Sequence, residues 1–210
     1  MNFLHKIPLR IFNLFYPLKI VGKENIPEGK AILCANHYSL LDCGYVATSY
    51  NNDIKFLAKK EIFKNKIFGA LVKSFGAFPI DREKPEITTL MAVIKWLKEG
   101  HKLAIFPEGT RNKSGTNQIQ EIKDGTMIFS LKSRSPIVPI IIYRKAKFLR
   151  RNYMIIGKPF ELEEFYGKKL NDEDVEKTNQ ILRAKMEEQY ALLEDYLLSK
   201  KRKKAKKKCK

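Results

Sequence analysis

Short apolar runs alternate with amphipathic or polar stretches along most of the chain. Each run has the length of a strand and ends in polar, glycine or proline residues, which is typical of buried β-strands. The runs lie within 19–29 and at 31–35, 54–58, 76–80, 102–106, 136–143 and 153–157. In addition, residues 85–98 place apolar side chains three and four positions apart, as in a helix with one buried face. Strands and helices in alternation predict an α/β domain.

The apolar run at residues 136–143 contains two prolines, Pro136 and Pro139. Proline has no N–H to donate to a sheet ladder, so it is confined to strand starts, sheet edges and bulges. We therefore expect this strand to begin at a proline or to form an irregular edge.

Both ends of the chain carry amphipathic segments. Residues 2–18 have apolar side chains at helical spacing, interrupted by Pro8 and basic residues. The segment is shorter than the roughly 20 apolar residues that a membrane span requires. We expect residues 1–18 to form an amphipathic helix that either lies in a membrane interface or packs on the core. Residues 171–199 predict a long helix whose apolar face consists of Leu182, Met186, Tyr190, Leu193 and Leu197.

Length and composition place these elements in one globular domain over residues 19–199. The 210 residues are 44% hydrophobic and 30% charged, which is a globular composition. The net charge is +18, and residues 200–210 contain nine Lys or Arg, so we expect a disordered lysine-rich tail. The remainder is also basic. Such a protein attracts polyanions, and both nucleic acid and an anionic membrane surface fit this description.

The three cysteines, Cys34, Cys43 and Cys209, predict neither a disulfide framework nor a zinc site. Their number is odd and they lack the paired spacing of metal ligands. A reducing cytoplasm suits this usage. Cys34 lies inside an apolar run, where we expect it to serve as a small buried residue rather than as a nucleophile.

A histidine and an aspartate follow the apolar run at residues 31–35. His37 and Asp42 are five positions apart, just before the expected start of a helix at Tyr45. This puts both side chains at the carboxyl edge of the sheet, where open α/β sheets bind ligands. A histidine oriented by a carboxylate can accept a proton from a substrate hydroxyl. A lone His-x4-Asp pair can equally cap a turn, so other stretches must decide.

Two further strand ends carry cationic groups. After the run at 102–106, Pro107 leads into Glu108-Gly109-Thr110-Arg111, a turn whose backbone N–H groups and arginine could bind a phosphate. An ordinary turn with a solvated arginine is the alternative. The run at 76–80 ends in Asp81 and Arg82, which adds a second arginine near a strand end.

Four blocks in this order resemble those of the glycerolipid acyltransferase family. They are Asn36-His37 to Asp42, Gly76 to Arg82, Phe106-Pro107-Glu108-Gly109-Thr110-Arg111, and Ile137-Val138-Pro139. The His-x4-Asp block alone is a weak signal, but joined to Phe-Pro-Glu-Gly-Thr-Arg it is a strong one. The blocks look most like the lysophosphatidate acyltransferase branch, and the resemblance covers roughly residues 19–160.

The resemblance implies a mixed, largely parallel sheet flanked by helices, similar to glycerol-3-phosphate acyltransferase. It also implies direct transfer of an acyl chain from a thioester to the sn-2 hydroxyl of 1-acyl-glycerol 3-phosphate, which gives phosphatidate. His37 would be the general base and Asp42 would orient it. The co-substrate would be acyl-CoA or acyl carrier protein, and neither a cofactor nor a metal ion is implied.

Family analogy also assigns binding roles. It places the phosphate and glycerol of the acceptor on one turn and on cationic side chains at other strand ends. Guanidinium groups suit a phosphate monoester because they bind its oxygens in pairs. The residues are Glu108, Gly109, Thr110 and Arg111, then Arg82, with Lys59 and Lys123 as additional candidates, and Val138 and Pro139 on the acyl side.

Two other functions remain as alternatives. An acyltransferase for a different lysolipid would keep the same base, although an acceptor without phosphate leaves Arg82 and Arg111 hard to explain. A nucleic-acid-binding protein would use the basic tail, but the aromatic residues form no basic-aromatic platform, which disfavours nucleic acid. An acceptor that resides in a bilayer favours an anionic membrane surface, so we expect peripheral or monotopic association with the cytoplasmic face of the cell membrane.

Overall fold

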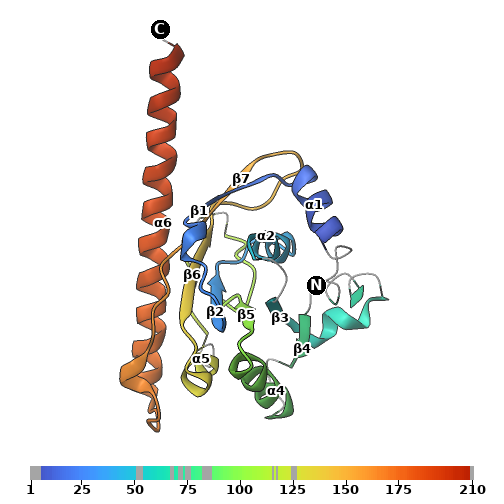
Figure 1. Ribbon diagram of the computed structural model, residues 1–210, viewed down its shortest axis with the longest axis vertical. Coiled ribbons are helices and arrows are strands. Elements are labelled where there is room, and N and C mark those ends of the chain that lie inside the picture. The colour runs from blue at the N-terminus through green and yellow to red at the C-terminus, as the bar shows by residue number, and fades with distance from the viewer. Residues whose placement is uncertain are drawn as a thin grey trace.

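A seven-stranded sheet forms the centre of the protein (Figure 1). The computed structural model describes residues 6–50, 54–66, 69–70, 73, 77–81, 87–114, 116, 118–123 and 127–208. The strand order is β1-β7-β6-β2-β5-β3-β4, and only β6 and β7 pair antiparallel. The strands are β1 Leu18–Val21, β2 Ala31–Ala35, β3 Ile54–Lys59, β4 Ala77–Ile80, β5 Lys102–Ile105, β6 Ile137–Ile142 and β7 Asn152–Ile156. The expected mixed, largely parallel sheet is confirmed.

Helices cover both faces of the sheet. α1 and α2 pack together over one face, whereas α4, α5 and α6 lie over the other. Short 3-10 turns, η2, η3 and η4, occupy three of the connections. The bounds are α1 Lys6–Phe15, η2 Lys23–Asn25, α2 Leu41–Ser49, η3 Lys60–Lys64, α4 Ile87–Lys98, α5 Ile128–Ser133, η4 Glu163–Phe165 and α6 Asp172–Lys208.

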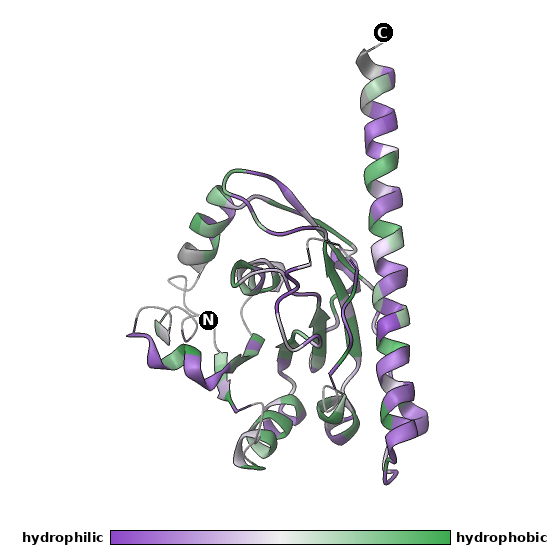
Figure 2. Cartoon of the chain, turned by 180° about the vertical axis from the view of Figure 1, so that it is seen from behind, coloured by the Kyte–Doolittle hydropathy of each residue, from purple (hydrophilic) through white to green (hydrophobic). Residues whose placement is uncertain are grey.

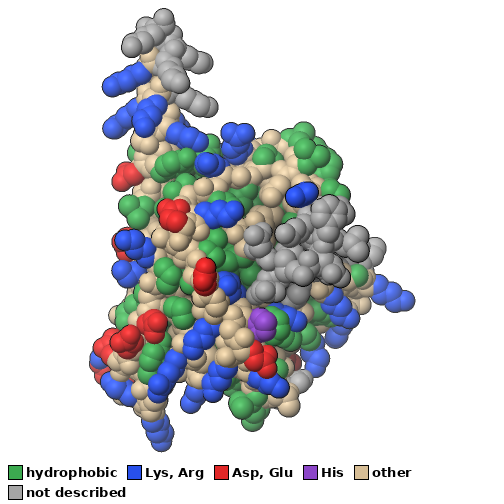
Figure 3. Space-filling view, viewed as in Figure 1, with side chains coloured by type: hydrophobic (Ala, Val, Ile, Leu, Met, Phe, Trp, Pro, Cys, Tyr) green, Lys and Arg blue, Asp and Glu red, His purple; other side chains and the backbone are tan. Residues whose placement is uncertain are grey.

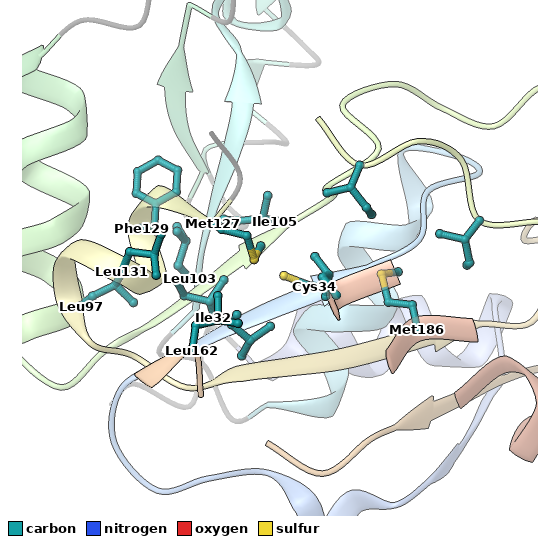
Figure 4. Packing of buried hydrophobic residues seen from close by; sticks show 14 of the residues in the cluster. Ile32, Cys34, Leu97, Leu103, Ile105, Met127, Phe129, Leu131, Leu162 and Met186 are labelled. Atoms are coloured by element: carbon teal, nitrogen blue, oxygen red, sulfur yellow. The ribbon is translucent and has the colours of Figure 1, made fainter. Parts of the chain in front are cut away.

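The central strands are buried from both sides, which explains their continuous apolar sequence. All five residues of β2 and all six of β6 are buried, as expected for parallel strands with helices on both faces. Figure 2 shows the apolar colour concentrated on these strands. On the α4–α6 side, Leu97 of α4 and Met186 of α6 join the cluster around Leu103 of β5, part of which Figure 4 shows at close range.

Two alternatives were expected for β6. The strand does begin directly after a proline, Pro136, but it is a central strand and not an irregular edge. It lies between β2 and β7 with Pro139 in its interior. The carbonyl of Pro139 accepts a hydrogen bond from the N–H of Gly157 (2.8 Å), directly after β7 ends. The nitrogen of Pro139, which carries no hydrogen, therefore faces the irregular segment that follows β7. The sheet ladder requires no donor there.

The lysine-rich tail is helical as far as the structure describes it, instead of disordered. α6 continues through Lys208 and extends beyond the body of the protein (Figure 1). The stretch contains no glycine or proline, and lysine is a good helix former. Cations near a helix C-terminus also interact favourably with the helix dipole. The apolar face predicted for this helix is confirmed, since Leu182, Met186 and Leu193 are fully buried.

α1 is shorter than the expected segment, and its two sides have different surroundings. It ends at Phe15, two residues before Pro17, and Leu18 already belongs to β1; residues 1–5 lie outside the described part. The ring of Phe12 packs against Tyr45 of α2, with centroids 5.5 Å apart. Ile11 and Leu14 are exposed. None of the described helices is both long and apolar enough to cross a bilayer.

Two neighbouring leucines of α6 provide a test of this packing. Leu193 is fully buried, whereas Leu192 is 49% exposed. We expect Leu193→Ala to lower the free energy of unfolding by about 2–5 kcal/mol because it leaves a cavity. Leu192→Ala should change it by less than about 0.5 kcal/mol. Urea unfolding measures both variants, and equal effects would contradict the docking of α6 on the sheet.

Candidate active site

Asn36 fixes the chain directly after β2. Its side-chain Nδ2 donates to the carbonyl of Ile142 (3.0 Å), and its Oδ1 accepts from the N–H of Ile142 (2.7 Å). The buried amide thus takes the place of one further residue of the β2–β6 ladder. Because Asn36 is held in this way, the next residue, His37, leaves the sheet at a defined position. Sequence reasoning missed this role, since an asparagine after a strand signals only a turn.

His37 and Asp42 form a hydrogen-bonded pair at the carboxyl edge of the sheet. The Nδ1–H of His37 donates to Oδ2 of Asp42 at 2.9 Å, and Asp42 is fully buried. The same oxygen accepts the backbone N–H groups of Tyr38 and Ser39, each at 2.6 Å. α2 begins at Leu41, earlier than the expected Tyr45, so Asp42 lies in its first turn, where a carboxylate is favoured by the helix dipole.

The turn after β5 contacts both the ring and the backbone of His37. The ring of Phe106 stacks on the imidazole with centroids 4.0 Å apart. The N–H of Asn112 donates to the carbonyl of His37 (2.7 Å). Asn112 also binds its own loop, because its Nδ2 donates to the carbonyls of Thr116 and Gln118. The two sequence blocks around His37 and Arg111 therefore form one structural unit.

Glu108 is buried and contacts the backbone of His37. Its Oε1 accepts the backbone N–H of His37 (2.9 Å), and its Oε2 accepts that of Gln120 (3.3 Å). Burial raises the pKa of this carboxyl from 4.5 to about 7, although both hydrogen bonds lower it. The observed contacts hold the site together. A direct contact between Glu108 and an acceptor stays a prediction from the sequence.

Arg111 lies at the rim of the site and lines a pocket of about 470 Å³. This pocket joins the residues after β2 and β5 to the connection between β6 and β7. Arg144 and Arg150 of that connection were not predicted as site residues, although the basic stretch that contains them is visible in the sequence. The lining residues are Tyr38, Arg111, Asn112, Lys113, Thr116, Arg144, Lys145 and Arg150.

The other predicted cations have different positions. Lys123 reaches the Pro107–Arg111 turn: its N–H donates to the carbonyl of Pro107, and a Cβ on Gly109 would lie 2.9 Å from its Cγ. Lys59 ends β3, which is two strands from β2, or about 10 Å at ordinary strand spacing. In this structure Lys59 and Lys123 are each within 4 Å of a glutamate, Glu61 and Glu121 respectively. Arg82 lies outside the described residues.

Gly109 and Thr110 complete the turn, and Val138 and Pro139 lie in β6. Gly109 has a φ of +67°, a conformation that favours glycine, and Thr110 is exposed. Val138 is fully buried in the same cluster as Tyr38 and Phe106, next to the histidine. Pro139, the neighbouring position, faces the other side of the sheet. Of these two residues, only Val138 is on the side of the sheet that holds His37.

The arrangement suits proton transfer at His37. Because Nδ1–H is engaged by Asp42, Nε2 carries the lone pair and can accept a proton. Cysteine chemistry is disfavoured near the site, because burial raises the pKa of Cys43 to about 12 and that of Cys34 further. Within the described part of the chain, no three His, Cys, Asp or Glu residues are grouped as for a metal ion.

The sequence of the chain resembles those of known proteins. A protein-family model described as "Acyltransferase" matches residues 17–143. The 1-acyl-sn-glycerol-3-phosphate acyltransferase of Bacillus subtilis (strain 168) is 32% identical over 168 residues, which cover 74% of this chain and 79% of that protein. The Streptococcus pneumoniae protein of the same name is 33% identical over 153 residues, and the match spans about half (54%) of its length.

A solved structure shares the fold. The crystal structure of the 1-acyl-sn-glycerophosphate (LPA) acyltransferase PlsC from Thermotoga maritima superposes with a TM-score of 0.64. The match covers 88% of this chain and 77% of that one, at 23% sequence identity. At this level of identity the likeness concerns the fold, and it agrees with the α/β architecture described above.

The raised pKa of Glu108 predicts a pH-dependent contribution to stability. Between pH 4.5 and 7 the folded protein retains a proton on Glu108 that the unfolded chain releases. The stability from this group is therefore complete below pH 4.5 and is lost as the pH rises through 7, by about 3 kcal/mol. Glu108→Gln cannot titrate. We expect the stability of wild type relative to this variant, measured by urea unfolding, to fall from pH 4.5 to 7.5.

The control for this experiment is Glu121→Gln, which changes an exposed carboxylate in the loop after the same turn. Relative to that variant, wild type should show no comparable fall. A difference between wild type and Glu108→Gln that is constant with pH would show that the carboxyl titrates normally in the folded protein.

Proposed function

The chain belongs to the acyltransferase family, and we propose that it transfers a fatty acyl chain from an acyl thioester to the sn-2 hydroxyl of 1-acyl-glycerol 3-phosphate, giving phosphatidate. The observation that carries the proposal is the His37–Asp42 pair, joined by Asn112 and Glu108 to the turn that presents Arg111. Two relatives that are 32–33% identical to the chain over 168 and 153 aligned residues are named 1-acyl-sn-glycerol-3-phosphate acyltransferase.

In the first step, Nε2 of His37 removes the proton from the sn-2 hydroxyl as its oxygen attacks the thioester carbonyl. The C–O bond forms, and the carbonyl oxygen takes up the electron pair of the C=O π bond. Asp42 stabilises the imidazolium and keeps the Nδ1 proton in place. The substrate supplies its own nucleophile, so no acyl-enzyme intermediate is needed.

In the second step, the tetrahedral intermediate collapses and the C–S bond breaks. The departing thiolate recovers the proton from Nε2 of His37, which returns the imidazole to its starting tautomer. The products are phosphatidate and a free thiol, and the proton balance closes within the site. Acyl-CoA and acyl carrier protein both provide such a thioester, and neither a cofactor nor a metal ion takes part in the scheme.

The acceptor phosphate binds to Arg111 in this proposal, with Thr110 and the N–H groups of its turn close by. Lys123 adjoins this turn, and Lys59 would add charge from the end of β3. Arg82 is kept as a candidate from the sequence. A phosphate monoester is a good match for guanidinium groups, which bind two of its oxygens at once. This requirement for phosphate argues against a lysolipid without one.

The acceptor is a membrane lipid, so the enzyme must work at a bilayer surface. We propose peripheral attachment to the cytoplasmic face of the membrane through the exposed side of α1, where Ile11 and Leu14 lie. Exposed lysines near the end of α6 would be attracted to anionic lipid. Both contacts leave the described body of the protein outside the hydrocarbon core.

Acyl transfer in mixed micelles tests the assignment of base and phosphate ligand. Wild type should convert 1-acyl-glycerol 3-phosphate to phosphatidate with a labelled acyl thioester. His37→Ala should lower kcat at least 10³-fold, because the base is lost, an effect within the range for such groups. Arg111→Ala should mainly raise KM for the acceptor, by tenfold or more. Arg134 directly follows α5 and does not line the pocket, so Arg134→Ala should leave kcat and KM unchanged.

If wild type were inactive with both donor types, the acceptor assignment would be wrong and other lysolipids would be tested next. Full activity of His37→Ala would refute the general-base role for any substrate.

Asp42→Asn tests the orientation of the histidine. Asparagine keeps the shape of the side chain but has no negative charge, and its amide can force the imidazole into the opposite tautomer. We expect kcat to fall by about 10²–10⁴ with little change in KM. Ser39→Ala is the matched control, since it removes only the 3.3 Å contact of Ser39 Oγ with Oδ1 of Asp42. Its kcat should stay within threefold of wild type.

A further inference from the structure

The connection between β6 and β7, residues 143–151, has an apolar tip on a cationic stem. Its sequence places Phe148 and Leu149 among five basic residues, and both are largely exposed, at 61% and 63%. In Figure 1 the connection extends from the sheet to the end of α1. We refer to residues 143–151 as the basic hairpin. The five basic residues are Arg144, Lys145, Lys147, Arg150 and Arg151.

The basic hairpin and α1 form one surface. The N–H of Leu149 donates to the carbonyl of Phe15 at 2.7 Å. The rings of Phe15 and Phe148 stack with centroids 5.5 Å apart, and Tyr16 meets Phe148 edge-on at 6.2 Å. Hydrophobic side chains gather over this corner of the molecule in Figure 3. The exposed members of the surface are Ile11, Leu14, Phe15, Phe148 and Leu149.

The backbone conformation of Leu149, in the apolar tip, is unfavourable for a leucine. Leu149 has a φ of +55°, a left-handed conformation that glycine and asparagine adopt more readily than leucine. An exposed leucine there bears the conformational cost and gains little from burial. Such a residue is expected where an apolar side chain is needed on the outside, at a contact made with another body.

The sequence on both sides of the tip carries charge of one sign. No acidic residue occurs between Asp124 and Glu161 in the sequence. The guanidinium groups of Arg144 and Arg150 donate to the carbonyls of Arg151 (2.9 Å) and Lys145 (2.8 Å), which holds them in place without neutralising them. Lys147 and Arg151 are exposed. An apolar patch with a cationic rim matches the surface of an anionic bilayer, which offers hydrocarbon beneath a layer of phosphates.

We propose that the basic hairpin is a membrane-docking element: Phe148 and Leu149 insert beside α1 into an anionic bilayer, and the basic stem binds lipid phosphates. The hairpin also reaches the active site, because Arg144, Lys145 and Arg150 line the same pocket as Tyr38 and Arg111. Docking would therefore place the mouth of that pocket at the level of the lipid head groups. This last step rests on the proposed function, since it assumes an acceptor lipid with a phosphate.

Binding of the full-length protein to vesicles tests the docking. The vesicles contain either zwitterionic phospholipid alone or the same lipid with one third anionic phospholipid. We expect Phe148→Ser and Leu149→Asn each to weaken binding to anionic vesicles at least fivefold, and the double variant at least twentyfold. Ile87→Ser and Met91→Ser remove exposed apolar side chains from α4 on the other face of the sheet. These two controls should bind like wild type.

Leu149→Asn also separates docking from folding. Asparagine accepts a positive φ better than leucine, so the melting temperature of this variant should equal or exceed that of wild type while vesicle binding falls. The double variant Lys147→Gln/Arg151→Gln tests the charge. It should lose its preference for anionic over zwitterionic vesicles and show a weaker dependence on salt than wild type.

Enzyme assays then distinguish docking from the proposed reaction. On a short-chain acceptor that is monomeric in water, Phe148→Ser and Leu149→Asn should keep kcat/KM within twofold of wild type. On the same head group embedded in vesicles they should lose fivefold or more. If wild type has no activity in either assay, the proposed function fails, but the binding measurements still decide the docking proposal.

Three results would overturn the docking proposal. The first is wild type that does not bind anionic vesicles, and the second is tip variants that bind as well as wild type. The third is a lipid-free dimer, seen by analytical ultracentrifugation, that Phe148→Ser converts to monomer. That outcome would assign the apolar surface to a second copy of the chain.

Discussion

The site depends on one buried carboxylate. Asp42 accepts three N–H groups on a single oxygen, from the ring of His37 and from the backbone of the two residues that follow it. A buried carboxylate is costly unless such donors surround it. The turn between β2 and α2 therefore has little freedom to adopt another shape, and the histidine tautomer follows from the same hydrogen bonds. The proposed chemistry requires this pre-organisation.

The strand order determines which residues surround the histidine. β2 lies between β5 and β6, so the turn after β5 approaches His37 from one side and the end of β6 from the other. Glu108 and Asn112 reach it from the β5 side, and the basic hairpin continues from the β6 side. Three segments that are about 70 and 105 residues apart in sequence thus contribute to one edge of the sheet. The central position of β6 makes this possible.

The elements at the ends of the chain depart furthest from the sequence-based expectations. Local pattern predicted disorder after residue 199, but the uninterrupted lysine-rich stretch simply prolongs α6. Local pattern also left two roles open for the first helix, core packing or contact with a membrane. In the structure Phe12 packs on α2, whereas Ile11 and Leu14 face outward. One side of the helix therefore packs on the domain, and the other side is exposed, as the proposed membrane contact requires.

The sequence by itself determined the strands, most helices and the residues of the proposed reaction. Apolar runs bounded by polar residues are local signals, and the His37–Asp42 pair spans only one turn of chain. Tertiary structure decided the rest. The hydrogen bonds of Asn36 to Ile142, the burial of Glu108 and the approach of Arg144 and Arg150 to Arg111 all join distant segments. Such contacts depend on strand order, which apolar periodicity does not encode, because every buried strand has the same pattern.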